Sequence, residues 1–542
     1  MNLLIITLIL LLALIAIRIS DVSGMPSLLL FLILGIVFKA LGFSTDFDFA
    51  EKFAIIALLI IMFYGGFGTN WQMGKPVVKE AVSLASLGVV ATALLTGAFA
   101  YFFLKTSLIE SMLLGSVVAS TDYASVSNIL TSKNLNLKYN TAPMLEIESG
   151  SNDPTAYTMT MIFLSILLGS DLLIPVLVIK QVLFGILIGF VSGYVMKKIV
   201  RNINLNKDGL FIIFMLAISL LVYSFTDLID GNGYLAVYIF GIYIGNQEYM
   251  GKRDVVFFFD GFAEILQIGL FFILGLLSEP SNIIKTLPVA FLIMVFMTLI
   301  ARPLSVFVLL KFFKAKSEQI LAVSFAGLRG AAAISFAIMA INSGANLTID
   351  LYHIVFGICF LSALIQGSLM PFVIKKLDML DPNDTVLKNF NYYQDKSDIG
   401  FLRTNVKKGT GLDGSYVRDL NLAFDFIVAK IIRDKKTIVP RGDIKLKAGD
   451  TIVLGGENYF DSLGSNLTET TLSNDHPWAN NKIMHLNIPK NILILMLQKE
   501  DGSIVVPDGS TFLIPGDKVV YIKEDEKIFI EYEKNKRNNI DS

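Results

Sequence analysis

The residues most able to do chemistry in this sequence are ionisable side chains inside long apolar stretches. A charge in the middle of a bilayer is costly unless it faces protein or water, so such residues mark ion pathways or buried ion pairs. They are Asp122, Glu146, Glu148, Asp153, Lys180, Asp260, Glu264, Arg302 and Arg329. Most of them are carboxylates, and a carboxylate can bind either a proton or a hard cation.

Small and hydroxyl-bearing residues flank two of these charges. Asp122 lies in Ser-Thr-Asp-Tyr at 120–123, where hydroxyl groups can take over backbone hydrogen bonds if the helix is broken. Arg329 lies in Ala-Gly-Leu-Arg-Gly-Ala at 326–331, and its glycines favour a second break. Two broken helices, one in each half, are typical of inverted-repeat transporters that bind ions at the membrane midplane. This prediction rests on spacing, since the two halves show no sequence repeat.

The elements that must position these residues are transmembrane helices. The chain has 542 residues, 54% hydrophobic and 17% charged, which is more apolar than a soluble core requires. Stretches of the roughly 20 apolar residues that cross a bilayer lie at 2–19, 25–43, 53–73, 81–104, 109–132, 141–169, 175–196, 209–226, 232–247, 255–277, 286–310, 318–342 and 351–374. The first has neither a basic leader nor a small-residue cleavage site, so we expect a retained span. The sequence predicts a polytopic α-helical membrane protein with about thirteen transmembrane helices.

Lys and Arg in the loops predict the orientation, because the side rich in them stays cytoplasmic. One side carries sixteen, whereas the other carries four, namely Lys39, Lys52, Lys105 and Lys285. This bias predicts a multi-pass protein of the plasma membrane, with the N-terminus outside and the region after Lys376 in the cytoplasm.

Three motifs, taken together, carry a resemblance to a known family. They are Thr-Asp at 121–122, Glu-Ser-Gly-Ser-Asn-Asp-Pro at 148–154 and Gly-Leu-Arg-Gly at 327–330, with a weaker match in Phe-Tyr-Gly-Gly at 63–66. The membrane part resembles bacterial monovalent cation/proton antiporters of the sodium/proton-exchanger type, and more narrowly the potassium/proton antiporters known as cell-volume-regulation proteins. The resemblance implies an inverted-repeat antiporter fold with two interrupted crossing helices, and a homodimer. Tyr123 departs from the pattern, because close relatives often have Pro there.

The resemblance also implies a role for each matched residue. Asp153 would be the carboxylate that binds a proton or a cation in turn, and Asn152 would orient it without adding charge, a form that goes with electroneutral exchange. Thr121, Asp122 and Ser149 would complete the oxygen shell of a monovalent cation held at Asp122 and Asp153. Glu148 and Arg329 would be a buried structural ion pair joining their two helices.

A structural alternative stands beside several of these roles. Asp122 and Asp153 could be capped by backbone amides or paired with Arg329 and Lys180. Asp260 and Glu264 lie four residues apart on one helix face, as in an ion funnel, but pairing with Arg302, Lys252 or Arg253 is an equally simple account.

The remaining ionisable residues receive simpler interpretations. Glu146 falls on a different helix face from Glu148, and a direct role in transport is an alternative to a structural one. Lys180 lies near the outer end of its stretch, where a long side chain can reach water. We interpret His353 and Cys359 as packing residues, with a pH sensor and a reactive thiol as the alternatives.

The C-terminal region has a different composition and an internal repeat. Residues 384–542 hold 45 of the 91 charges, and the pattern V-P-x-G-x-x-x-L-x-x-G-D occurs at 439–450 and again at 506–517. Strand-like segments flank both copies, and the Gly-Asp pairs predict tight turns. The first copy resembles the TrkA C-terminal (RCK C-terminal) domain, a small α/β cytoplasmic module that binds regulatory ligands and dimerises. A lobe that only solubilises or stabilises a dimer is the alternative.

These patterns predict four parts of the chain. They are a transmembrane exchanger domain at 1–376, a linker at 377–398, a TrkA-C-like regulatory domain at 399–468 and a second, diverged lobe at 480–533. No G-x-G-x-x-G motif follows a strand, so we expect no NAD-binding half.

The combined prediction is a secondary active antiporter that exchanges a cytoplasmic monovalent cation, K⁺, for H⁺ under control of the cytoplasmic domain. A Na⁺/H⁺ antiporter and a sodium-coupled solute symporter are the alternatives. A potassium channel would need a Thr-Val-Gly-Tyr-Gly filter, and an ATP-driven pump would need a phosphate-binding loop, but the sequence has neither. One Cys and three His argue against a disulfide or a structural metal, and a net charge of -1 argues against nucleic acid. We expect no cofactor beyond the transported ions and, by the resemblance, a regulatory nucleotide on the C-terminal domain.

Overall fold

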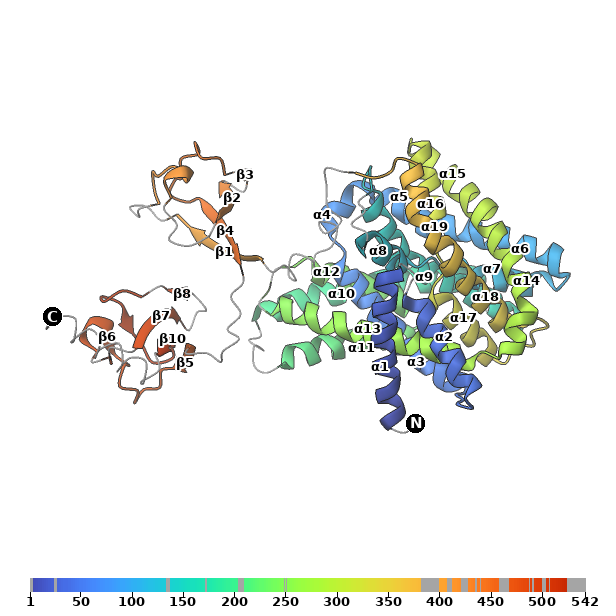
Figure 1. Cartoon of the computed structure of the whole chain (residues 1–542), viewed down its shortest axis with the longest axis horizontal. Coiled ribbons are helices and arrows are strands. Elements are labelled where there is room, and N and C mark those ends of the chain that lie inside the picture. The colour runs from blue at the N-terminus through green and yellow to red at the C-terminus, as the bar shows by residue number, and fades with distance from the viewer. Residues whose placement is uncertain are drawn as a thin grey trace. The chain divides into compact units, whose positions relative to one another are not determined.

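The protein is described here from a computed structural model (Figure 1). The described residues are 3–23, 27–132, 137–170, 173–202, 209–247, 249, 251–381, 399–406, 412–420, 427–433, 436–438, 440–457, 467–486, 488–489, 492–499, 504–505 and 507–523. The chain divides into two compact units, Met1–Ser397 and Asp398–Ser542. The first is helical and the second contains strands (Figure 1).

A helix or a pair of half-helices lies at each of the apolar stretches predicted from the sequence. The unbroken α-helices are α1 (Leu3–Ser23), α2 (Ser27–Ala40), α3 (Phe47–Gly68), α9 (Thr141–Leu167), α10 (Ile174–Asn202), α11 (Leu210–Leu228), α12 (Gly233–Gly245) and α13 (Lys252–Leu277). Three composite helices contain a π-turn: α4 to α6 (Trp71–Leu104), α14 to α15 (Pro280–Phe312) and α18 to α19 (Leu351–Lys376). A π-turn accommodates one extra residue, because its hydrogen bonds join residues five apart.

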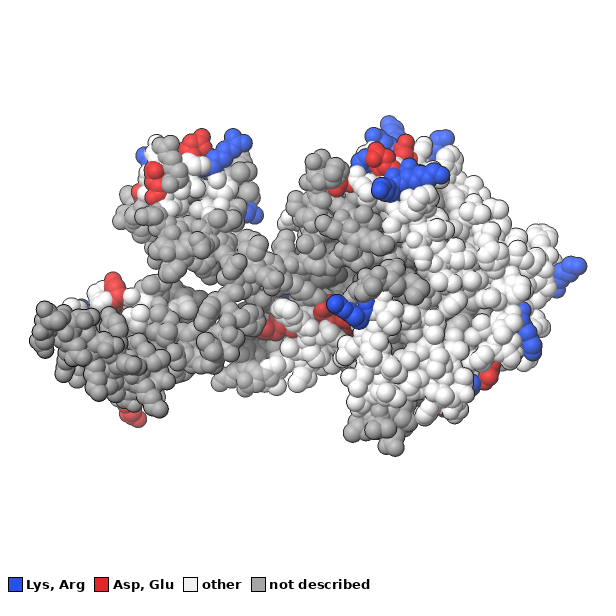
Figure 2. Space-filling view, viewed as in Figure 1, with Lys and Arg blue, Asp and Glu red and all other residues white. Residues whose placement is uncertain are grey.

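Six helices in the described part are long and apolar enough to cross a membrane. Others are shorter apolar helices, including α2, α12, Leu108–Val117 and Ala331–Asn342, so the count of thirteen crossings stays a prediction. Figure 2 shows a broad uncharged face on this unit, with charges gathered at one end near α15, α16 and α19. Exposed lysines at that end are Lys311, Lys314, Lys316, Lys375 and Lys376. An uncharged belt of this kind suits contact with lipid.

Two helices are interrupted, as the sequence predicts. The first consists of α7 (Leu108–Val117) and α8 (Tyr123–Ser132), and the second of α16 (Ser317–Phe325) and α17 (Ala331–Asn342). The breaks fall at 118–122 and 326–330, the segments that contain Asp122 and Arg329. Each break leaves carbonyl groups at the end of one half-helix and amide groups at the start of the next without helical partners.

Helices α2 and α13 cross in close contact. In α2, a Cβ atom added to Gly35 would lie 2.2 Å from the carbonyl oxygen of Phe272 in α13. In α13, a Cβ added to Gly275 would lie 2.2 Å from the carbonyl oxygen of Leu32. The two helix backbones therefore touch at paired glycines, which is a common way for membrane helices to pack.

The second unit contains two lobes with the same strand order. The first sheet has the order β1-β4-β2-β3 and the second has β5-β10-β7-β8. The strands of the first are β1 (Ile399–Asn405), β2 (Ile427–Arg433), β3 (Lys436–Ile438) and β4 (Thr451–Glu457), and those of the second are β5 (Leu467–Thr471), β7 (Ile492–Gln498), β8 (Ile504–Val505) and β10 (Lys518–Lys523). A further antiparallel pair, β6 (Asn481–Lys482) and β9 (Phe512–Leu513), falls between β5 and β10 in the sequence. The predicted repeat is a structural duplication.

The predicted boundary between the lobes is wrong. β5 pairs antiparallel with β10, the closing strand of the second lobe, just as β1 pairs with β4 in the first. The second lobe therefore begins at or before Leu467, and neither the predicted end at 468 nor the predicted start at 480 holds. The linker beyond Asp381, the residues after 523 and any helices of the predicted α/β module lie outside the described residues.

The two Gly-Asp pairs form equivalent turns, as predicted. Gly449 and Gly516 both have φ of 94°, a conformation that favours glycine. The following aspartates are buried, and each pairs with a basic side chain: Asp450 with Arg433 and Asp517 with Lys499, both at 2.6 Å between N and O atoms. These pairs fix the turn that closes each sheet.

Candidate ion-binding site

The site is built where the two helix breaks cross. The backbone N–H of Asp122 donates to the carbonyl oxygen of Leu328 at 2.8 Å, which ties one break to the other. Gly330 permits this approach, because a Cβ added there would lie 2.5 Å from the Cβ of Asp122. The crossing therefore needs both a broken helix and a residue without a side chain.

Arg329 caps the C-terminal end of α7, in the other interrupted helix. Its Nη1 atom donates to the carbonyl oxygen of Ala119 at 2.6 Å and to that of Ser120 at 2.8 Å. These carbonyls follow the last turn of α7, where helical partners run out and the helix dipole favours a cation. The guanidinium group thus holds the segment that carries Ser120, Thr121 and Asp122.

Asp153 lies on α9 against this segment. Its side chain is 8% exposed and accepts a hydrogen bond from the hydroxyl group of Ser120. Asp122 is half-buried and accepts from the hydroxyl group of Ser125. Sequence reasoning missed Ser120 as a site residue, although it stands directly before the Thr-Asp pair that was singled out.

Thr121 is held by two side chains of α9. Its carbonyl oxygen accepts from Ser149 Oγ at 2.8 Å and from Asn152 Nδ2 at 3.3 Å, and Asn152 also contacts the Thr121 hydroxyl group. Two donors occupy both lone pairs of a carbonyl oxygen. The oxygen atoms best placed for a cation are therefore those of the two carboxylates and of the Ser120 and Ser149 hydroxyl groups.

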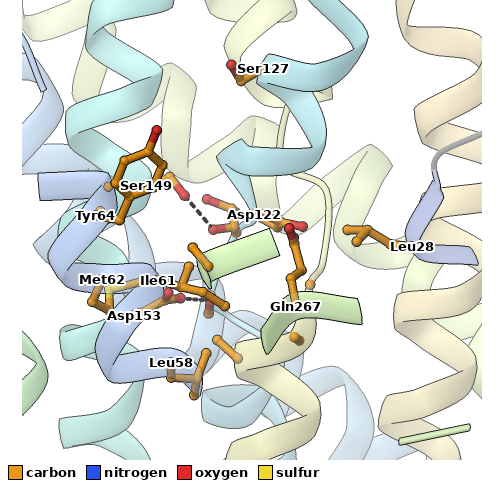
Figure 3. A pocket seen from close by; sticks show the side chains of 18 of the residues that line it. Leu28, Leu58, Ile61, Met62, Tyr64, Asp122, Ser127, Ser149, Asp153 and Gln267 are labelled. Atoms are coloured by element: carbon orange, nitrogen blue, oxygen red, sulfur yellow. Dashed lines mark hydrogen bonds between the residues drawn. The ribbon is translucent and has the colours of Figure 1, made fainter. Parts of the chain in front are cut away.

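A cavity of about 430 Å³ joins these residues. It is lined by both breaks, by α9 from Glu146 to Asp153, and by α2, α3 and α13. Figure 3 shows Asp122 and Asp153 in this cavity with Ser149, Tyr64 and Gln267 nearby. Carboxylates and hydroxyl groups in a partly apolar cavity suit a small hard cation.

Asp260 and Glu264 of α13 line the same cavity. Asp260 accepts a hydrogen bond from the hydroxyl group of Tyr64 at 2.6 Å between oxygens. The alternative that pairs them with Arg302 is wrong, because Arg302 is buried against Glu148, and the side chain of Arg253 lies outside the described residues. The funnel interpretation gains support from their place in the cavity wall.

The predicted Glu148–Arg329 pair is wrong. Glu148 pairs with Arg302, at 2.6 Å between Oε1 and Nη2, and the two side chains are 1% and 2% exposed. Arg302 begins α15 directly after the π-turn of Met297–Ala301. Arg329 instead reaches the free carbonyls of the other break, which only the tertiary crossing brings within range.

The other ionisable residues have partners outside the pair of carboxylates. Lys180 pairs with Asp230 at 2.9 Å and is 40% exposed, as expected for a side chain near the end of its helix. His353 Nε2 accepts from the backbone N–H of Glu279 at 2.9 Å, and Nδ1 lies 2.8 Å from Asp350. Cys359 is buried, with Sγ 3.5 Å from the carbonyl oxygen of Gly330. These contacts fit the packing interpretation of His353 and Cys359.

Aromatic rings lie one turn beyond Asp153, past the last α9 residue that lines the cavity. The ring of Tyr157 lies 5.4 Å from that of Tyr234 and 5.8 Å from that of Phe336, measured between centroids. Tyr223 adds a fourth ring, 5.0 Å from Tyr234. We call Tyr157, Tyr223, Tyr234 and Phe336 the aromatic plug, since it packs the space between α9, α11, α12 and α17 on that side of Asp153.

Known families match both units of the chain. The description "Sodium/hydrogen exchanger, transmembrane" matches residues 6–376, which include both breaks and the cavity. The chain belongs to the sodium/hydrogen exchanger family. It is accordingly a multi-pass membrane transporter of the cation/proton antiporter type. The TrkA-C domain matches residues 402–458, within the first lobe of the second unit.

Three relatives named as antiporters match between 54% and 82% of the chain. It is 30% identical to the "K(+)/H(+) antiporter NhaP2" of Shewanella baltica (strain OS223) over 459 residues, which are 82% of this chain and 79% of the relative. It is 33% identical to the "K(+)/H(+) antiporter NhaP" of Alkalimonas amylolytica over 374 residues, 68% of this chain and 65% of the relative. It is 28% identical to the "Probable Na(+)/H(+) antiporter 2" of Methanocaldococcus jannaschii over 314 residues, 54% of this chain and 72% of the relative.

A solved structure shares the fold of the membrane unit. The sodium proton antiporter MjNhaP1 from Methanocaldococcus jannaschii at pH 8 aligns with a TM-score of 0.62 and 23% identity, over 68% of this chain and 97% of that one. The likeness confirms the predicted antiporter fold of the membrane unit.

Proposed function

We propose that this protein exchanges cytoplasmic K⁺ for H⁺ across the plasma membrane, one for one, with Asp153 as the shared binding group. The observation that carries the proposal is the pair of carboxylates, Asp153 and Asp122, in one cavity at the crossing of two broken helices. The relatives named as K⁺/H⁺ antiporters and the TrkA-C match support potassium as the cation.

The geometry explains how exchange is made obligatory. A buried carboxylate is stable when a proton or a cation neutralises it, and it is costly when it is bare. Asp153, which Ser120 holds in place, can carry one or the other but not both. The change that exposes Asp153 to the other side of the membrane is unfavourable while its carboxylate is charged and empty. Each change of access therefore carries either a cation or a proton.

Electroneutral exchange follows from the neighbour of Asp153. Asn152 is uncharged and its amide group is engaged by Thr121, so it orients the break without adding a second titrating group. One carboxylate that alternates between a proton and a monovalent cation moves no net charge. Ser149 and Asp122 support the cation in this proposal, while Thr121, which the family resemblance also placed in the oxygen shell, accepts from Ser149 and Asn152 and positions both side chains.

The direction of access follows from the basic loops. The cavity runs along the first half of α9 and the middle of α13; Lys138 precedes α9, and Lys252 is the first residue of α13. By the positive-inside bias these ends of the two helices are cytoplasmic, so the cavity opens toward the cytoplasm and the aromatic plug faces outward. Asp260 and Glu264 then attract cations into the cytoplasmic opening.

The direct test is exchange in everted membrane vesicles. Asp153→Asn keeps the shape of the side chain and removes its charge, so K⁺-dependent proton movement should be lost while the amount of folded protein is unchanged. Asp122→Asn should weaken exchange severely. An Asp153→Asn variant that keeps half the parental rate would contradict the assignment of Asp153.

The choice of cation and the role of the second unit need one further comparison. We infer that the second unit is a cytoplasmic regulator that acts through a homodimer and binds a small ligand such as a nucleotide. The comparison measures K⁺- and Na⁺-dependent proton movement in the full chain and in a version ending at Lys376. Preference for Na⁺ in both would overturn potassium as the substrate, and identical rates and pH profiles would overturn regulation by the second unit.

A further inference from the structure

Glu146 lies in the same cavity as Asp153, on the same helix. Seven residues separate them, which is two helical turns or about 10 Å along one face of α9. Glu148, between them in sequence, points elsewhere and pairs with Arg302. Glu146 is 8% exposed, and no ion pair found among the described residues includes it. Its polar neighbour is the hydroxyl group of Thr69.

A tyrosine hydroxyl group lies between the two carboxylates. Tyr238 is 2% exposed, lines the cavity, and packs on Gly150, where an added Cβ would lie 2.5 Å from the tyrosine oxygen. That oxygen has the side chains of Thr69 and Ser151 as polar neighbours. A phenolic oxygen has two lone pairs, so it can make a hydrogen bond to a neighbour and still contact a cation in the cavity.

Pro154 adds a backbone oxygen to the same wall. Proline has no N–H, so the carbonyl group of Gly150 lacks the donor that an ordinary helix would supply four residues later. Gly150 lines the cavity between Glu146 and Asp153. A carboxylate, a hydroxyl group and a carbonyl group of this kind are the ligands that a hard monovalent cation prefers.

We propose that Glu146, with Tyr238 and Gly150, forms a second binding station for the cation, on the cavity side of Asp153. The proposal deepens the proposed exchange and rests on it for the identity of the ion. A buried carboxylate with no basic partner holds a proton when the station is empty. When a cation arrives, the carboxyl O–H bond breaks, the proton leaves into cavity water, and the cation binds the carboxylate oxygens. As the ion moves two turns along α9 to Asp153, the Asp153 carboxyl O–H bond breaks and its proton passes through cavity water to the vacated Glu146 carboxylate, so both groups stay neutralised.

The test counts protons released by K⁺ from the purified full-length protein in weakly buffered detergent. Addition of KCl should release protons from both stations in the parent, and choline chloride should release none. Asp153→Asn should keep about half of the parental release, and Glu146→Gln should also keep about half. The double variant should release none. Size-exclusion elution and melting temperature confirm that each variant is folded.

Three outcomes separate the two proposals. If Asp153→Asn releases as little as the double variant, or if Glu146→Gln releases as much as the parent, the second station is overturned. If the parent itself releases no protons with KCl, the exchange function fails instead.

Tyr238→Phe tests the hydroxyl group. In the Asp153→Asn background, it should raise the KCl concentration for half-maximal release several-fold, whereas Tyr243→Phe, on the same helix but outside the cavity lining, should not. An unchanged concentration in Tyr238→Phe would remove the tyrosine from the station.

Discussion

Two buried arginines next to the cavity have different partners, and this difference decides what each one does. Arg302 faces the carboxylate of Glu148, whereas Arg329 faces the backbone carbonyls of Ala119 and Ser120. Removing one partner of a buried ion pair leaves the other charge uncompensated. Removing a capping donor instead releases a backbone segment. The two arginines should therefore fail in different assays.

Arg302→Ala should lower stability. It leaves Glu148 buried without a counter-charge, a loss of about 3–5 kcal/mol in buried pairs. Adding Glu148→Gln should recover most of the loss, because the uncompensated charge disappears. Melting of the purified single and double variants measures this effect, and an additive loss in the double variant would show that the pair is not coupled.

Arg329→Ala should lower exchange, and Glu148→Gln should not rescue it. The guanidinium group holds the segment that carries Ser120 and Asp122, so its loss displaces the donor to Asp153. Exchange rates of Arg329→Ala with and without Glu148→Gln provide the measurement. Full rescue of exchange by Glu148→Gln would instead support the Glu148–Arg329 ion pair that the sequence predicted.

At the scale of elements, the site depends on how closely the two breaks cross. Backbone atoms of 118–122 and 326–330 form a direct hydrogen bond, from Asp122 to Leu328. Neither break ends with a proline: α8 resumes at Tyr123 and α17 at Ala331. Tyr123, the departure from the family pattern, is thus compatible with a full interruption. The space for the crossing comes from Gly330.

Gly330→Ala should reduce exchange strongly. The added methyl group would lie 2.5 Å from Cβ of Asp122, so the two segments must move apart. Displacement of a reacting group by about 1 Å can cost about 100-fold in rate. Gly261→Ala is the matched control, because an added Cβ there meets no atom within 4 Å. Equal exchange rates for the two variants would show that the crossing tolerates the displacement.

The aromatic plug should prevent water from reaching Asp153 from both sides of the membrane at the same time. Tyr234→Ala removes the ring that contacts Tyr157 and Tyr223, which should open a route past Asp153. We expect a proton leak in the absence of K⁺, measured as decay of a pH gradient in proteoliposomes. Tyr243→Ala, on the same helix but outside the plug, should not leak. If Tyr234→Ala shows no proton leak, the aromatic plug is not the barrier on the outer side of Asp153.

At the scale of the whole molecule, a helical unit is joined to a duplicated pair of small sheets. The two lobes share strand order and the Gly-Asp turn, but they differ in the basic residue that pairs with the aspartate. In the first lobe, a hydrogen bond from Arg433 lowers the pKa of Asp450, and the backbone N–H of Lys447 adds to the effect. The first lobe should therefore respond to acid through this turn.

The sign of that response follows from the lowered pKa. Asp450 stabilises the folded lobe fully above its unfolded pKa of about 4, and the contribution is lost as the pH falls toward the folded pKa. Hydrogen exchange of a β4 peptide in the full chain, corrected for intrinsic rates, should show protection falling between about pH 5 and about pH 3. Asp450→Asn should show lower protection that varies less over this range. Parallel pH curves for the two proteins would exclude Asp450 as the acid-sensitive group.

Much of the architecture could be predicted from the sequence, because its causes are local. Apolar stretches of membrane-spanning length, the Gly and hydroxyl residues beside Asp122 and Arg329, and the repeated V-P-x-G pattern each act within a short segment. Helices therefore lie where the hydropathy predicts them, both breaks occur, and the two lobes share one strand order. The roles of Asp153 and Asp122 stay predictions that the vesicle assays test.

The pairing of charges was decided by the tertiary structure. The sequence predicted Arg329 as the partner of Glu148, whereas the observed pairing with Arg302 depends on how α9, α15 and the breaks meet in space. Ser120, Tyr238 and Gly330 gain their meaning only from that crossing. Similarly, β5 joins the second lobe because it finds its partner in β10, nearly fifty residues away. Sequence spacing predicts which residues share a helix face, but contacts between distant segments depend on the packing of the whole bundle.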